Sequence, residues 1–180
     1  MMNKLPTALC AVLAAVLVAF GLLYGTWSGF HEDRAQVNGL LTMENGLLDV
    51  LSYRAADAIN LSAVAKRHLP AQDEDLVLLE KTGRELQLAA DVRTATSLDH
   101  AVADAFSAVS GKLKETATFQ ESQRDQRYLD MLTADLNSLR ASDAVTAYNQ
   151  AAADFNTQLS QPVSGALASL LGIEMCPLYQ

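Results

Sequence analysis

The feature that most limits the fold of this 180-residue chain is an uncharged stretch near its N-terminus. No Asp, Glu, Lys or Arg occurs from Leu5 to Phe30, which is roughly 39 Å if helical. Within this stretch, Ala8–Trp27 is long enough to cross the ~30 Å hydrocarbon core of a bilayer. Aromatic residues, which favour the headgroup region, gather at its end as Tyr24, Trp27 and Phe30. The sequence therefore predicts a transmembrane anchor in residues 1–30.

A cleaved signal peptide is the alternative to an anchor. Its apolar region usually has about 7–15 residues and is followed by small residues at the cleavage site. Here Phe20 and Leu22–Tyr24 are bulky, and the apolar run follows Cys10 instead of preceding it, which does not fit a lipoprotein signal. We expect an uncleaved, single-pass anchor. Lys4 weakly favours an N-terminus inside the cell, which predicts a bacterial inner-membrane protein with a periplasmic body.

Small residues recur at four-residue spacing along the predicted span. Ala11, Ala15 and Ala19 form one row, and Gly21, Gly25 and Gly29 form another. Small residues four apart let two membrane helices approach closely, although Ala and Gly are also common in such helices generally. Packing of the span against a second copy through the glycine row is one hypothesis.

The rest of the chain is acidic. Because Lys4 is the only charged side chain before residue 31, residues 31–180 carry all 21 acidic and the other 12 basic residues, a net charge of −9. This charge argues against nucleic acid, whose phosphates require a basic surface, and against anionic lipid headgroups. Another protein is the expected partner.

The body has the apolar periodicity of α-helices and no alternating strand pattern. One stripe of small and apolar residues ends at Leu69-Pro70, and a helix start follows at Asp73-Glu74-Asp75. Thr94–Ser97 is either a break or a weak stretch within one helix, and Gly111–Phe119 is the next expected connection. One long helix with a shift of its stripe near Arg140 is expected from Tyr128 to Leu159. The predicted fold is all-α: an N-terminal transmembrane helix, with which the first body helix can be continuous, followed by an antiparallel bundle of long helices over residues 31–161.

Residues 162–180 form an apolar C-terminal segment and tail. The uncharged stretch Pro162–Ile173 is too short for a second span and can cap the bundle core or lie on a membrane or partner. Cys176, the only thiol of the body, is either inert or forms a bridge between molecules.

No set of residues typical of an enzyme stands out. His31, His68 and His100 are scattered, and no phosphate-binding or nucleophile motif occurs. His100 and Asp104 could share a metal but are only two ligands. We therefore expect no cofactor, no metal and no enzymatic activity.

Two pairs of residues recur at heptad spacing, Tyr148-Asn149 and Phe155-Asn156. This spacing places both rings on one face of a helix with both amides beside it, as core aromatics with polar neighbours or as a ligand-binding set. Arg54 and Asp57, three residues apart, are expected to form an ordinary helical ion pair.

The two pairs, followed by Pro162 and a small apolar stretch to Gly172-Ile173, resemble the C-terminal end of the LemA family, in which Tyr-Asn occurs twice before a Pro. Tyr128-Leu129 resembles the start of that family's last helix. A third segment resembles the family's Arg-Arg-x-Asp-Leu-Ile-Pro-Asn-Leu: Arg54-Ala55-Ala56-Asp57-Ala58-Ile59-Asn60-Leu61.

The chain departs from the family pattern at three points, because Ala55 replaces an Arg, no Pro precedes Asn60, and Phe155 replaces the second Tyr. It resembles a divergent member. The resemblance implies a long-helix bundle tethered by one span, with Arg54, Asp57, Asn60 and the two aromatic–Asn pairs as interaction residues. It also implies association with envelope membrane proteins, including membrane proteases.

We expect a non-enzymatic scaffold or adaptor that self-assembles, binds another envelope protein, or does both. The alternative is an exported helical bundle that senses a small ligand, although such sensors normally continue to a second span and a signalling domain.

Overall fold

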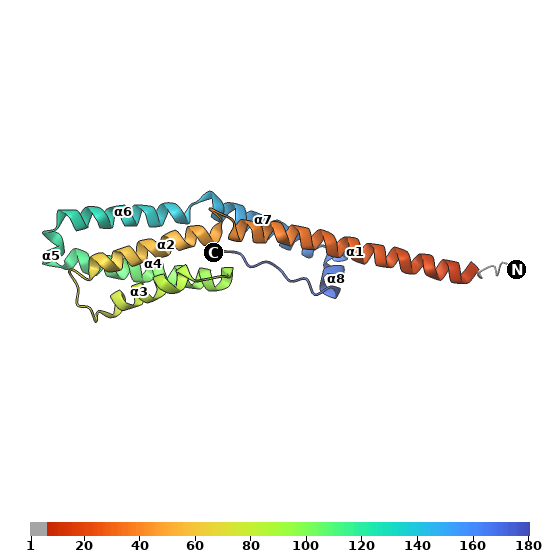
Figure 1. The fold of residues 1–180 in the computed structure, drawn as a ribbon, viewed down its shortest axis with the longest axis horizontal. Helices are drawn as coiled ribbons and strands as arrows, with labels where there is room; N and C mark the ends of the chain where they lie inside the picture. The colour runs from red at the N-terminus through yellow and green to blue at the C-terminus, as the bar shows by residue number, and fades with distance from the viewer. Residues whose placement is uncertain (1–6) are drawn as a thin grey trace. The chain divides into compact units, whose positions relative to one another are not determined.

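A computed structural model describes residues 7–180, with side chains from Leu9 onward, so Lys4 lies outside the described residues. All regular structure in this range is helical and no strand occurs in it, as the sequence predicts. The helices are α1 (Thr7–Thr42), α2 (Leu47–Ala65), α3 (Glu74–Gln87), α4 (Val92–Glu115), α5 (Ala117–Gln120), α6 (Gln123–Arg140), α7 (Asp143–Leu159) and α8 (Pro162–Leu170) (Figure 1).

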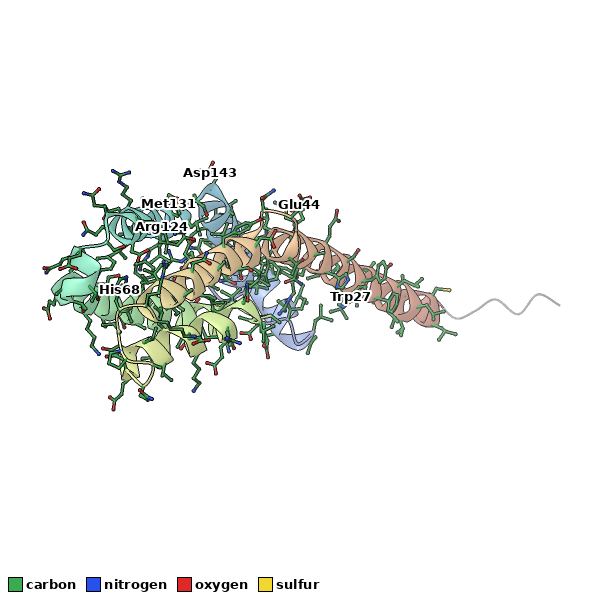
Figure 2. The ribbon with its side chains drawn as sticks, turned by 60° about the vertical axis from the view of Figure 1, so that its left-hand side comes forward. Trp27, Glu44, His68, Arg124, Met131 and Asp143 are labelled. Atoms are coloured by element: carbon green, nitrogen blue, oxygen red, sulfur yellow. The ribbon has the colours of Figure 1, made fainter. Side chains whose placement is uncertain are left out.

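Helix α1 contains the predicted span and continues beyond it without a break to Thr42. It is long and apolar enough to cross a membrane: an 18-residue window has a mean hydropathy of 2.3, and none of that window is buried. Trp27 lies on the outside of this part of the helix (Figure 2). Bulky apolar side chains are exposed on all sides here: Leu9, Val12, Leu13, Val16, Leu17, Val18, Phe20, Leu22 and Tyr24.

The chain forms two compact units. The first joins the chain up to Val37 with Ala151–Cys176, and the second joins Asn38–Gln150 with Pro177–Gln180. The unit boundaries fall inside α1 and α7. We call the helical part of the second unit, residues 38–150, the helical body.

In the helical body, α2 packs against α3, α4 and α6, and α3 packs against α4, so that these four helices lie alongside one another (Figure 1). The core of the body follows the apolar stripes that the sequence predicts. Apolar residues on α2, α3, α4 and α6 are almost fully buried: Leu47, Leu51, Ala58, Leu61, Leu76, Leu79, Val102, Val109, Leu113, Leu132 and Leu136.

Helix ends within the body are fixed by side-chain caps. Asp73, at the predicted start of α3, accepts hydrogen bonds from the backbone N–H groups of Asp75 and Leu76. Asp91 accepts from Thr94 N–H and starts α4, so the break lies at Leu88–Asp91 and Thr94–Ser97 is helical. A cap satisfies N–H groups that the helix itself leaves unpaired, which explains why each helix begins at these residues.

Two predicted connections differ from the structure. Gly111 lies within α4, which continues to Glu115, so the connection there is shorter than predicted. The expected single helix from Tyr128 to Leu159 is interrupted at Ala141–Ser142 and forms α6 and α7. The shift of the apolar stripe near Arg140 therefore marks a helix break.

The first unit has a small core of its own. Phe30 and Phe155 are both buried and meet edge to face, with ring centroids 6.1 Å apart. Pro162 occupies the first turn of α8, where proline is tolerated, and Gly172 ends that helix with φ +69°. The N–H of Ile173 donates to the Ala168 carbonyl at 2.9 Å, which is the Schellman pattern that a left-handed glycine permits.

Candidate functional site

The most deeply buried charges of the helical body form an ion pair between α2 and α4. Arg54 Nε donates to Asp99 Oδ1 at 2.5 Å, and Arg54 Nη2 donates to Asp99 Oδ2 at 3.1 Å. Arg54 Nη1 also donates to the carbonyl of Leu136 on α6. Arg54 and Asp99 are each only 1% exposed, so water does not screen this pair. The guanidinium therefore links three helices through charge-assisted hydrogen bonds.

Both charged residues lie on otherwise apolar helix faces. Arg54 shares its face of α2 with Leu47, Leu51 and Ala58, and Asp99 shares its face of α4 with Val102. A charge in such a position must find a partner within the protein, because an unpaired buried charge costs several kcal/mol.

The predicted ion pair between Arg54 and Asp57 is wrong, because the guanidinium turns toward Asp99 instead. Asp57 Oδ2 is buried without a hydrogen-bond partner. Its burial, together with the nearby charge of Asp135, raises the pKa of Asp57 to about 6, and Arg54 only partly opposes this. Asn60, from the same segment, is exposed.

The last four residues of the chain are held by the helical body. Tyr148 Oη donates to the Pro177 carbonyl at 2.8 Å. Asn149 binds the backbone of Tyr179 at two points: its Nδ2 donates to the Tyr179 carbonyl at 2.8 Å, and its Oδ1 accepts from the Tyr179 N–H at 2.9 Å. His100 Nε2 lies 2.7 Å from the carbonyl of Gln180. The first aromatic–Asn pair of the sequence is therefore a backbone clamp.

Tyr179 completes the buried polar centre of the body. Its hydroxyl donates to Asp99 Oδ2 at 2.6 Å, and the residue is only 5% exposed. Burial and the hydrogen bond to the neighbouring carboxylate raise the pKa of Tyr179 far above its usual value, so the phenol stays protonated and acts as a donor. Asp99 thus accepts from Arg54 on one side and from the end of the chain on the other.

The second aromatic–Asn pair makes the same kind of clamp within the first unit. Asn156 Nδ2 donates to the Cys176 carbonyl at 2.8 Å, and Asn156 Oδ1 accepts from the Cys176 N–H at 2.8 Å. Arg34 donates to the Glu174 carbonyl at 3.3 Å. Cys176 is a free, buried thiol, and burial raises its pKa, which lowers its reactivity.

Each asparagine binds one backbone residue with the same donor-and-acceptor geometry: Asn149 binds Tyr179 within the second unit, and Asn156 binds Cys176 within the first. The sequence predicts the heptad spacing and the buried rings but not the segment that the amides bind, because that segment carries no apolar period.

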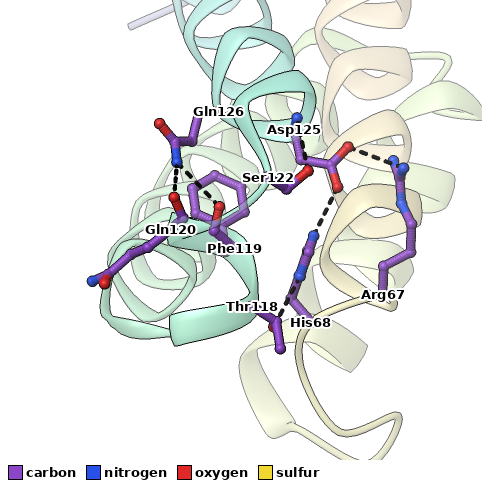
Figure 3. Close-up of polar contacts among 8 residues, drawn as sticks. All are labelled: Arg67, His68, Thr118, Phe119, Gln120, Ser122, Asp125 and Gln126. Carbon is purple, nitrogen blue, oxygen red and sulfur yellow. Dashed lines mark hydrogen bonds and ion pairs between the residues drawn. The ribbon is translucent and has the colours of Figure 1, made fainter.

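A second polar cluster closes the end of the body at the junction of α2, α5 and α6 (Figure 3). His68 Nδ1 lies 3.1 Å from Thr118 Oγ1, and His68 Nε2 lies 2.8 Å from Asp125 Oδ2. Arg67 Nη1 pairs with the other oxygen of Asp125 at 3.0 Å. The hydrogen bond with His68, and to a lesser extent the charge of Arg67, holds the pKa of Asp125 below its usual value.

A hydroxyl, an imidazole and a carboxylate in hydrogen-bond contact also form the catalytic triads of hydrolases. Here, however, Arg67 shares the carboxylate, and the His68 ring packs edge-on against Phe119 with centroids 5.4 Å apart. These contacts join the segment that follows α2 to α5 and α6, which indicates a structural role. Within residues 7–180, no group of three His, Cys, Asp or Glu side chains is arranged to hold a metal, and His100 of the candidate metal pair contacts Gln180.

The glycines of the predicted packing row are exposed on α1. A Cβ atom placed on Gly21, Gly25 or Gly29 would meet nothing within 4 Å, so this strip is open to a second helix.

No protein-family model matches the sequence, and a comparison with curated proteins found no match. The LemA resemblance therefore stays a prediction from the residues quoted above.

Proposed function

We propose that this protein is a membrane-tethered, non-enzymatic scaffold or adaptor that assembles with itself or with another envelope protein, as the LemA resemblance implies. The observation that carries the proposal is the N-terminal part of α1. Its apolar side chains are exposed on all sides, and Gly21, Gly25 and Gly29 form an open strip along it. An apolar surface of this length suits a lipid environment, and small residues suit helix pairing within it.

The proposed arrangement is one span in the inner membrane and an antiparallel helical bundle on the periplasmic side. The buried charges of the body support a structural role for that bundle. Arg54, Asp99 and Asp125 each bond to another element of the same chain. These residues therefore hold the helices together in a fixed arrangement, as a binding platform requires.

A ligand-sensing bundle is the weaker alternative. In such a sensor the ligand binds between the helices, but the polar centre of this body already holds the chain's own Tyr179 against Asp99.

The proposal is tested by crosslinking the full-length protein in intact cells and purifying it in mild detergent. We expect a crosslinked homo-oligomer or a co-purifying envelope protein. Gly25→Leu should weaken self-association, because a bulky side chain would hold two helices apart, whereas Leu17→Ile on the same helix is the matched control. A monomer with no co-purifying protein in either setting would overturn the proposal.

A further inference from the structure

The last four residues contact the helical body as a bound peptide contacts its receptor. The segment Pro177–Gln180 has no helical structure, and its carbonyl or N–H groups are bonded at Pro177, Tyr179 and Gln180 by side chains from α4 and α7. Backbone recognition of this kind fixes the register of an extended chain without reading its sequence. The Asn149 clamp, with one donor and one acceptor, also fixes its direction.

The side chain of Tyr179 supplies the selectivity. It is buried, and its hydroxyl donates to the Asp99 carboxylate, which Arg54 holds in place. Leu178, in contrast, is 40% exposed, so the site does not discriminate between side chains at this position. A site built in this way recognises a peptide with tyrosine at the position of Tyr179 and rejects a peptide that lacks the hydroxyl, because Asp99 would lose one of its buried donors.

We propose that this site also binds the Pro177–Gln180 segment of a second copy of the chain, so that neighbouring copies exchange their tails. Every contact described above joins the tail to the body, so a tail from a neighbour can make the same contacts. Exchange of an identical segment requires no new interface and is a low-cost route to assembly. Tethering of copies in one membrane raises the local concentration of tails, which is the condition under which exchange competes with the attached tail.

This inference rests on the proposed self-assembly and deepens it by naming a second contact between copies. In a monomer the chain's own tail occupies the site. The site becomes available when the tail is lost.

The experiment uses full-length protein in mild detergent and a fluorescent peptide, Glu174–Gln180 with Ser in place of Cys176. The receptor is Tyr179→Ala, which retains the site but has a defective tail. A second receptor carries a protease site after Met175, so that a folded chain can be cut to release its own tail. We expect fluorescence anisotropy to report saturable binding to both receptors, at least tenfold weaker binding to the uncut wild type, and at least tenfold weaker binding of the peptide with Ala in place of Tyr179.

Asn149→Ala in either receptor should weaken peptide binding at least tenfold, whereas Asn60→Ala, an exposed asparagine of α2, should not change it. Absence of saturable binding to the cut, folded receptor would overturn the inference. Because peptide binding does not require the span, this result would leave self-association through α1 standing. Conversely, Gly25→Leu can be added to either receptor to prevent association through α1. Peptide binding by this monomeric receptor would support the tail site even if α1 does not pair with a second copy.

Discussion

Removing the Arg54 guanidinium should destabilise the helical body strongly. In Arg54→Met the apolar stem is largely retained, but Asp99 loses two charge-assisted hydrogen bonds and keeps only the bond from Tyr179. Both residues are 1% exposed, so the carboxylate would remain in the core without its counter-charge. Breaking a buried ion pair from one side typically costs about 3–5 kcal/mol. At about 4 °C per kcal/mol for a helical body of this size, we expect Tm to fall by about 12–20 °C.

The assay is thermal unfolding of the full chain in detergent micelles, followed by circular dichroism at 222 nm. The control is the double variant Arg54→Met with Asp99→Leu, which removes both charges. If the cost arises from the stranded carboxylate, the double variant should be more stable than the sum of the two single losses predicts, by at least 1–2 kcal/mol. A loss below about 1 kcal/mol in Arg54→Met, or simple additivity in the double variant, would refute this reasoning.

Three other substitutions test separate parts of the structure. Asp57→Asn should stabilise the body above pH 6, because the raised pKa of about 6 means that the ionised form opposes folding. The expected gain in the free energy of unfolding is about 1 kcal/mol after allowance for solvent screening. Urea titrations should show this gain at pH 7.5 and its loss as the pH falls toward 4, and no gain at pH 7.5 would contradict the burial of this carboxylate. Asn149→Ala should cost about 1–3 kcal/mol, because two backbone groups of Tyr179 lose their partners; hydrogen exchange should show loss of protection at that N–H, with Asn60→Ala as the unaffected control. Asp125→Asn should destabilise the body at pH 7, because the carboxylate accepts from both His68 and Arg67. Since folding lowers the pKa of Asp125, the difference in the free energy of unfolding between variant and wild type should shrink as the pH falls below about 4. A difference that stays constant from pH 7 to pH 3 would argue against the ion pair.

The sequence predicts the helical class and the apolar N-terminal helix because both depend on local patterns. The uncharged stretch and the 3.6-residue periodicity identify elements and faces without reference to distant residues. Leu47, Leu51 and Leu61 share one helical face of α2, and all three are fully or almost fully buried.

The polar contacts depend on packing and could not be predicted in the same way. Asp57 is three residues from Arg54, but the true partner, Asp99, is 45 residues away. One signal in the sequence points to a buried ion pair: Asp99 falls on the same helical face as Ala95 and Val102, where a charged residue requires a buried partner.

The aromatic–Asn pairs stand out in the sequence as a motif, but the backbone groups that they bind do not. Tyr148 and Phe155 are core residues, as their spacing predicts, with exposures of 2% and 1%. The amides of Asn149 and Asn156 bind the non-helical residues Tyr179 and Cys176, and sequence periodicity carries no information about such residues.

The side of the membrane that holds the body requires an exposed label. Cys176 is unsuitable because it is buried and burial raises its pKa. Asp143 is exposed at the start of α7 (Figure 2). With both native cysteines replaced by Ser, Asp143→Cys should react with a membrane-impermeant maleimide in intact spheroplasts if the body is periplasmic. Reaction only after lysis would place the body inside the cell.

The central claim is that α1 anchors the protein in a membrane, and alkaline extraction of membranes from cells that express the full chain tests it most directly. The apolar, unburied surface from Leu9 to Trp27 predicts that the protein stays in the membrane pellet at its full length. A variant with Val16→Lys and Phe20→Lys, which places two charges within the proposed span, should leave the pellet. Release of the wild-type chain into the supernatant, or recovery of a chain that lacks this helix, would contradict the claim.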